Sequence, residues 1–495
     1  MAAPPPLGLV GGPPKPPRFS YITQPFSSRD TLWTKISIKV VSLPFTTRYS
    51  VIMSQAKSPT PVALASFANM FSIGTLYALS TLQSQLPRLL DVDTYGCGTL
   101  LNPFVLASFG LSLGVTTCPR LLKRSSPATV TGVGTTLWGA GLFAAGCALT
   151  LLHSHWSSSH LLVQLLLSLS FFLGGIGVGW TYLSTVVWTS QILPAGSLAR
   201  TAIGPLGFSA GAMVVGFAGV WGGVDFLNVQ TLAAVVRGVG VGIASVGGLT
   251  MGLFSDAAAA GPGTAGDTKE EKPEQEKNKE QNQHGRPSSS PPTRGSFQIL
   301  LFFNALPGMT LLSNFFPPLS PHHQSSATTT TSPLLFTSLA LGGLLTPLLS
   351  KALSPRTLFI TLFSIRGVML ILLSLSLQIP QILNRNLIFY MRLATIATIL
   401  FAHGVGFSSL PGLVKRRLPR GADFAREYGV ILGAWGFAGV VGCWVSAGAF
   451  QEGQGGEAEC SAVRLPCSRL AGVMALAAGM VMAGRRGWVV GGFLE

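Results

Sequence analysis

From residue 61 to its end, the chain alternates between long apolar segments and shorter polar ones. A helical run of about 20 apolar residues crosses the roughly 30 Å hydrocarbon core of a bilayer. We count twelve segments of this length, which predicts twelve membrane-spanning helices. They cover approximately 61–85, 97–118, 129–152, 161–187, 201–222, 230–254, 296–317, 333–353, 357–379, 386–411, 427–450 and 467–490.

Two polar regions divide this pattern. Residues 1–58 are rich in Pro, Ser, Thr and basic residues, and 255–295 holds the run KEEKPEQEKNKEQNQ. Neither has the apolar content to form a core, so we expect a disordered extension and a disordered cytoplasmic linker. The extension resembles a transit peptide in composition, but a cytoplasmic tail, or untranslated sequence before a start at Met53, fits as well. The predicted organisation is one six-helix half over 59–254 and a second over 296–495.

The charge distribution supports a membrane protein. Charged residues make up 10% of the chain, against roughly a quarter in soluble domains. With the N-terminus inside, eleven basic residues fall in the short inner loops and four in the outer loops, as the positive-inside rule requires. The net charge of +16 therefore reflects topology. We expect the partner to be a lipid bilayer, of the plasma membrane or an organelle, and not a nucleic acid.

Several strings look like catalytic or cofactor motifs but lack the required context. Gly207–Gly211 matches G-x-S-x-G, yet it lies inside an apolar helix. The glycine runs 174–179 and 238–242 likewise predict close helix packing. We expect no enzyme activity and no cofactor. The six cysteines form no CxxC pair, so no metal site is expected, and Cys460 and Cys467 are either free thiols or a disulfide.

Polar side chains inside the spans are the candidate substrate-binding residues, because a charge at mid-membrane is costly and usually faces a cavity. Arg366, near the middle of the ninth span, is either an anion-binding cation or a contact to carbonyls of neighbouring helices; Arg392 is a second cation. His403 titrates near neutrality, or is a neutral histidine bonded to a helix. No Asp or Glu lies at the centre of a span. The other candidates are neutral: Tyr77, Gln83, Asn102, Tyr182, Asn304 and Trp435.

Five strings resemble one transporter family: GTLYALSTLQSQL, GIGVGWTYLSTVV, ARTAIGPLGFSAGAM, FFNALPGM and YGVILGAWGFAG. They are similar to signatures of the oxalate/formate antiporter and monocarboxylate carrier branch of the major facilitator superfamily. The nodulin-like branch has a similar first span and is a second possible affiliation. The matching positions are Gly74, Tyr77, Ser80, Tyr182, Asn304, Gly308, Met309, Tyr428, Gly429, Ala434, Gly436 and Ala438.

The resemblance implies an all-α membrane protein with twelve transmembrane helices in two six-helix halves, and a substrate site between the halves. Three positions depart from it. Trp435 stands where the dicarboxylate carrier has a lysine, Gly343 falls where it has an arginine, and Cys118 replaces the gating Asp of the superfamily. The loss of both cations argues against oxalate as the substrate.

We therefore expect a monomeric transporter, secondary active or facilitative, that carries a small organic solute by alternating access. The expected substrate is a monocarboxylate, with a proton or a counter-anion as the coupled species. The alternative is a membrane sensor or scaffold that keeps the same fold without transport.

Overall fold

The computed structural model describes residues 59–78, 103–153, 160–193, 198–221, 229–254, 294–313, 327–378, 385–418, 423–451 and 468–478. All of these belong to one compact unit, Ile52–Glu495. Each of the twelve predicted apolar regions contains a helix, and the described ranges hold no strand. The predicted N-terminal extension, most of the linker, and Cys460 and Cys467 lie outside the described residues.

The helices of the N-terminal half are α2 (Pro59–Gly74), its 3-10 continuation η1 (Thr75–Ala78), α4 (Pro103–Leu122), α5 (Pro127–His153), α6 (His160–Ile192), α7 (Leu198–Trp221) and α8 (Val229–Phe254). Those of the C-terminal half are α10 (Arg294–Ser313), α11 (Ala327–Ala352), α12 (Pro355–Gln378), α13 (Arg385–Arg417), α14 (Phe424–Gln451) and a short helix, Ser468–Ala478. These two sets of helices are what we call the halves below.

The outer surface of the helices is apolar. Seven of the described helices are long and apolar enough to cross a membrane, and three shorter ones are also apolar. Large apolar side chains lie exposed along them, for example Leu169 at 54%, Val368 at 52% and Leu476 at 68%. Soluble proteins rarely expose apolar area on this scale, whereas lipid tails cover it without cost. The protein is an integral multi-pass membrane protein.

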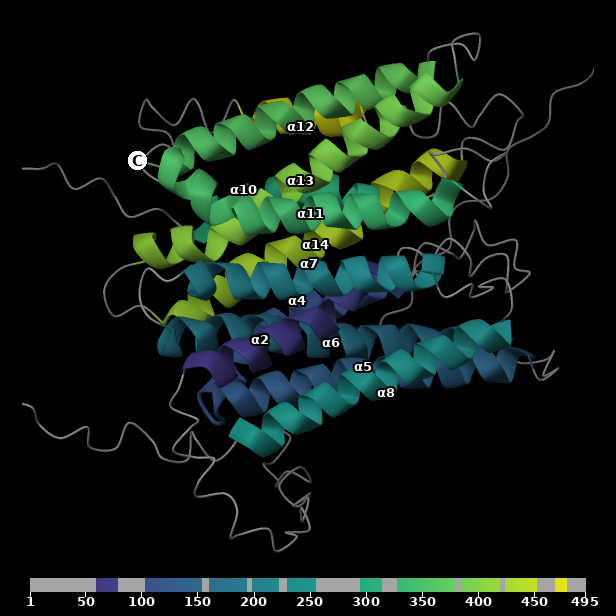
Figure 1. The fold of residues 1–495 in the computed structure, drawn as a ribbon, viewed down its shortest axis with the longest axis vertical. Helices are drawn as coiled ribbons and strands as arrows, with labels where there is room; N and C mark the ends of the chain where they lie inside the picture. The colour runs from purple at the N-terminus through teal and green to yellow at the C-terminus, as the bar shows by residue number, and fades with distance from the viewer. Residues whose placement is uncertain are drawn as a thin grey trace, which may run out of the picture. The chain divides into compact units, whose positions relative to one another are not determined.

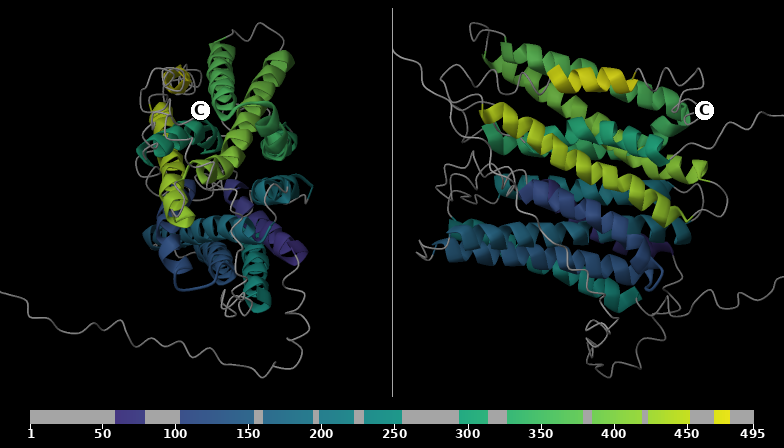
Figure 2. Two further views of the ribbon diagram at one scale, coloured as in Figure 1. Left: turned by 90° about the vertical axis from the view of Figure 1, so that its left-hand side faces the viewer. Right: turned by 180° about the vertical axis from the view of Figure 1, so that it is seen from behind.

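Neighbouring helices lie side by side along much of their length (Figures 1 and 2). In the N-terminal half, α5 packs on α6 and α8, α4 on α6, and α2 on α7. In the C-terminal half, α10 packs on α14, and α13 on α11 and α12. Four pairs join the halves in the described residues: α4 with α14 and α7 with α11, which make the most extensive contacts, and α7 with α13 and α6 with α14. Since α7 also contacts η1, the elements η1, α6, α7, α13 and α14 are connected at the junction of the halves.

Glycines allow the closest of these contacts. A Cβ at Gly211 would overlap the carbonyl oxygen of Phe71, which confirms that the G-x-S-x-G string packs α7 on α2. Gly240 of α8 likewise faces the backbone of α5. The packing prediction was wrong for Gly238 and Gly242, which face open space. Residues two apart point about 200° apart on a helix, so alternate glycines cannot all face one neighbour.

A buried hydrogen-bond network fixes four helices of the N-terminal half. Asn69 of α2 donates its amide to the hydroxyl of Thr250 in α8 at 2.7 Å. Thr135 of α5 donates its hydroxyl to the Asn69 amide oxygen at 2.7 Å. Thr135 also lies 3.2 Å from the hydroxyl of Thr181 in α6. Hydrogen bonds that join apolar helices in this way specify their relative positions.

Candidate functional site

Aromatic rings from both halves meet at the centre of the bundle, and we call them the central cluster. At least three elements of the N-terminal half and two of the C-terminal half contribute to it. Each side chain is at most 5% exposed, so the rings are shielded from solvent and from lipid. The members are Tyr77 of η1, Tyr182 of α6, Phe208 of α7, His403 and Phe407 of α13, and Trp435 of α14.

Ring contacts connect the two halves within this cluster. The Tyr182 ring centroid lies 5.2 Å from that of Phe407 and 6.0 Å from that of Trp435. Phe208 lies 6.2 Å from each of the same two rings. Aromatic pairs attract at centroid separations of about 4.5–7 Å. The halves are therefore in direct contact at their centre.

Tyr77 makes a polar contact between the halves within the central cluster. Its hydroxyl lies 3.3 Å from Nε2 of His403, and its ring meets Phe208 edge-on at 4.8 Å. One turn earlier, a Cβ at Gly74 would overlap the carbonyl oxygen of Phe208. The glycine therefore lets α2 approach α7 closely enough for η1 to present Tyr77 to the other half.

Arg366 is fully buried and ties three helices together. One terminal nitrogen donates to the backbone oxygen of Asn304 at 2.6 Å and to its side-chain oxygen at 2.8 Å. The other donates to the carbonyl oxygen of Ala402. The sequence offered two interpretations of Arg366, an anion-binding cation or a contact to carbonyls of neighbouring helices. The hydrogen bonds to the backbone oxygens are contacts of the second kind. The third nitrogen, Nε, has no hydrogen-bond partner among the described residues.

Asn304, Arg366 and His403 pack against one another, and we call them the polar triad. A Cβ at Gly308 would overlap the His403 ring, and one at Gly406 would overlap the Asn304 side chain. The two glycines therefore make room for the triad between α10 and α13.

The positive charge of Arg366 has no described counter-charge. Asp423 and Glu427 are the acidic residues within the described ranges, and both lie in the first turn of α14 or just before it. Glu427 is about 12 Å along the helix axis from Trp435. A buried cation without a carboxylate is costly unless something else neutralises it.

The central cluster and the polar triad contain buried nitrogens without hydrogen-bond partners. Four side-chain nitrogens of the cluster and the triad, Asn304 Nδ2, Arg366 Nε, His403 Nδ1 and Trp435 Nε1, are buried without a hydrogen-bond partner among the described residues. The Trp435 nitrogen lies near the Tyr77 hydroxyl but not in hydrogen-bonding geometry. Because the Asn304 oxygen accepts from Arg366, its amide nitrogen must face away from that bond. Asn304 Nδ2, Arg366 Nε and Trp435 Nε1 can only donate, and His403 Nδ1 donates in the tautomer whose Nε2 accepts from the Tyr77 hydroxyl.

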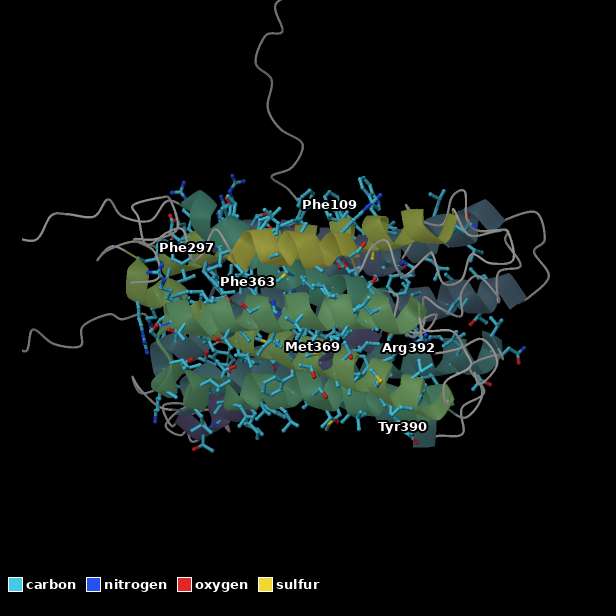
Figure 3. All side chains as sticks on the ribbon, turned by 90° about the horizontal axis from the view of Figure 1, so that it is seen from above. Phe109, Phe297, Phe363, Met369, Tyr390 and Arg392 are labelled. Atoms are coloured by element: carbon cyan, nitrogen blue, oxygen red, sulfur yellow. The ribbon has the colours of Figure 1, made fainter. Side chains whose placement is uncertain are left out.

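The other sequence candidates do not join the cluster. Arg392 of α13 donates to the carbonyl of Ser376 at 3.0 Å, and lies about 16 Å along the helix from His403. Figure 3 shows it toward the end of α13 that carries Tyr390. Gln83 and Asn102 lie outside the described residues.

Two members of the central cluster were missed from the sequence. Phe407 lies four residues after His403 and therefore on the same face of α13, where its ring stacks on the imidazole at 6.3 Å. Phe208 lies within the string ARTAIGPLGFSAGAM. The helical spacing and the motif were the signals that could have identified them.

Both positions where the resemblance places a cation hold a packing residue. Trp435 is fully buried, with its ring 4.7 Å from that of Phe407. A Cβ at Gly343 would lie 3.4 Å from Cβ of Pro205, so α11 and α7 pack directly at that point. Arg366 is therefore the one cation that the described residues bring to the cluster.

No protein-family model and no curated protein matches this sequence. Solved structures do match the fold. The inward-open xylose transporter XylE from E. coli has a TM-score of 0.62 at 13% identity, covering 88% of this chain and 100% of that one. A D-xylose-proton symporter gives 0.60 at 12% identity, with 88% and 97% covered. XylE bound to 6-bromo-6-deoxy-D-glucose, described as a major facilitator superfamily proton:xylose symporter, gives 0.61 at 13% identity, with 90% and 100% covered.

The chain has the major facilitator fold. This confirms the predicted fold class, an all-α membrane protein of the major facilitator type. The affiliation with the oxalate/formate branch is not decided by these matches and stays a prediction. In the major facilitator fold of this chain, the central cluster lies where α2, α6 and α7 face α13 and α14.

Proposed function

We propose that the protein is a secondary transporter that carries a small organic solute by alternating access. The solute binds between the halves, against the central cluster and the polar triad. Three features support this: the fold, the apolar spans, and a junction in which buried polar groups lack partners. Transporters of this architecture bind their substrates near the bilayer midplane at the interface of their repeats.

The donor set around Arg366 supports a monocarboxylate as the substrate. A carboxylate only accepts hydrogen bonds. Three of the four unpartnered nitrogens, those of Asn304, Arg366 and Trp435, only donate, and the fourth, Nδ1 of His403, donates in one of its two tautomers. A sugar brings hydroxyls that donate as well as accept, and the one amide oxygen in the triad is already bonded to Arg366. The carboxylate would also neutralise the guanidinium, in a charge-assisted hydrogen bond. The rings of the cluster suit the apolar remainder of such an acid.

We propose His403 and Arg366 as the groups through which a second ion acts, either a proton or an exchanged anion. His403 contacts Tyr77 of the opposite half, so its state affects the junction of the halves directly. Uptake driven by an inward proton gradient would indicate that the second ion is a proton. Uptake that requires an anion inside the vesicles would indicate that it is an exchanged anion.

The test is initial-rate uptake of labelled acetate, lactate and xylose into proteoliposomes with the purified protein. We expect saturable uptake of at least one monocarboxylate. Arg366→Lys keeps the charge but loses the planar fork, and should reduce kcat/KM by about tenfold or more, the equivalent of one charged hydrogen bond. The matched control is Arg237→Lys in α8, a half-buried arginine outside the cluster.

Three outcomes would contradict the proposal in different ways. Uptake of xylose without any monocarboxylate would overturn the substrate class. Equal flux in Arg366→Lys and Arg237→Lys would remove Arg366 from the site. No flux of any solute would favour the alternative, a membrane sensor or scaffold with the same fold.

A further inference from the structure

Trp138 of α5 lies behind the site and contacts η1, the element that presents Tyr77. Its ring is fully buried, and its Nε1–H donates to the hydroxyl of Thr75 at 2.9 Å. That hydroxyl in turn donates to the carbonyl oxygen of Ser72 at 2.7 Å. Thr75 is the first residue of η1, so Trp138 is bonded to the point at which α2 changes from α-helix to 3-10 helix.

The position of Thr75 determines where Tyr77 points. The two residues are two apart in one short 3-10 turn, so a shift of the first moves the second. The Tyr77 hydroxyl meets His403 at 3.3 Å, which is already long for a hydrogen bond. A displacement of a few tenths of an ångström would therefore break this hydrogen bond between the halves.

Trp138 is itself held in place by glycines of α6. A Cβ at Gly174 would lie 2.7 Å from Cε3 of Trp138, and one at Gly177 would lie 2.8 Å from its backbone nitrogen. Since α6 also carries Tyr182, the indole fixes η1 relative to the helix that supplies another ring of the cluster.

We infer that Trp138 is a positioning residue for the solute site: it holds η1 so that Tyr77 reaches His403 of the opposite half. This rests on the function proposed above. Trp138 itself contacts no member of the polar triad through a hydrogen bond, and it acts through Thr75 and Tyr77.

The chain offers a matched control. Trp180 of α6 makes the same kind of bond, from Nε1 to the hydroxyl of Thr117 at 3.0 Å, but at a partly exposed position away from η1. Trp138→Phe and Trp180→Phe each remove one indole donor to one threonine. A general effect of that change on folding would appear in both variants.

The experiment is a double-mutant cycle on the KM for uptake, with Tyr77→Phe as the second change. We expect Trp138→Phe to raise KM by about 2- to 10-fold with little change in kcat, the range of a single lost hydrogen bond. Once Tyr77→Phe is present, the same substitution should have a much smaller effect, because the contact to be positioned is gone. Trp180→Phe should leave KM unchanged and combine additively with Tyr77→Phe.

The same cycle measured on the thermal midpoint of unfolding keeps the inference testable without transport. Coupling between Trp138 and Tyr77, and none between Trp180 and Tyr77, supports positioning even if no solute is carried; in that case only the proposed function fails. Additive effects of Trp138→Phe and Tyr77→Phe on both KM and the midpoint would overturn the inference. So would an equal rise of KM in the two tryptophan variants.

Discussion

The contact between α4 and α14 brings the backbones of the two halves together. A Cβ at Gly436 of α14 would lie 2.6 Å from the carbonyl oxygen of Ser108 and 2.9 Å from Cβ of Ser112. One turn away, Ser112 donates its hydroxyl to the carbonyl oxygen of Gly433 at 2.8 Å. The two backbones therefore touch, and a side chain at 436 has no space while the halves are closed here.

Gly436→Ala should destabilise this closed arrangement. The added methyl meets backbone and Cβ atoms, which cannot rotate away, and overpacking of this kind costs about 1–3 kcal/mol. That energy corresponds to a shift of about 5- to 150-fold away from the packed state. The control is Gly238→Ala in α8, where a Cβ meets nothing within 4 Å. Both changes gain the same helix propensity, so their difference isolates the steric term.

Two assays read this shift. If the transport cycle passes through the closed α4–α14 contact, Gly436→Ala should lower the initial rate of uptake severalfold, and Gly238→Ala should not. Ser108 of α4, which is fully buried against Gly436 and Gly439 of α14, provides a second readout as Ser108→Cys in a chain whose six native cysteines are replaced. Labelling of this introduced thiol should accelerate in Gly436→Ala, because labelling of a transiently opened site follows the open population. Equal rates and equal labelling in the two variants would refute the reasoning.

Two further predictions concern stability and the triad. Asn69→Leu removes three hydrogen bonds of the amide, two of them to other helices, while the hydroxyls of Thr135 and Thr250 keep their bonds to carbonyls of their own helices; each lost hydrogen bond costs about 0.5–1.5 kcal/mol. Asn69→Leu should therefore lower the thermal midpoint of unfolding. The control is Ser245→Ala, which removes an exposed hydroxyl that bonds its own helix and should leave the midpoint unchanged. Equal midpoints in the two variants would contradict a stabilising role of the network. Gly308→Ala should push the His403 ring out of the triad and raise KM, while Gly412→Ala in α13, with open space around it, should leave KM unchanged. A KM that does not respond to Gly308→Ala would separate His403 from the site.

The helical regions could be predicted from the sequence because the bilayer imposes one length on every span. All twelve apolar regions contain a helix, and the described bounds of α8, Val229–Phe254, differ by one residue from the predicted 230–254. The high cost of a charge at mid-membrane likewise marked Arg366, which the structure places beside the cluster. Both signals depend on one segment alone and need no knowledge of its neighbours.

The partners of these residues could not be predicted, since they depend on how each helix is rotated and how deep it lies. Nothing in the sequence indicates that Arg366 bonds the carbonyl of Ala402, or that Trp138 reaches Thr75. The contacts of the glycine runs could not be predicted either. Gly240 packs on a neighbour while Gly238 and Gly242 do not, although the sequence makes them look equivalent.

The central claim is that a solute site between the halves opens alternately to each side of the membrane. Counterflow tests it most directly: proteoliposomes are loaded with an unlabelled monocarboxylate and diluted into a trace of the labelled acid. A carrier of this kind predicts a transient accumulation of label above equilibrium, which Arg366→Lys reduces and Arg237→Lys preserves. A channel would give equilibration without an overshoot, and a sensor no entry of label. Either result would contradict the account.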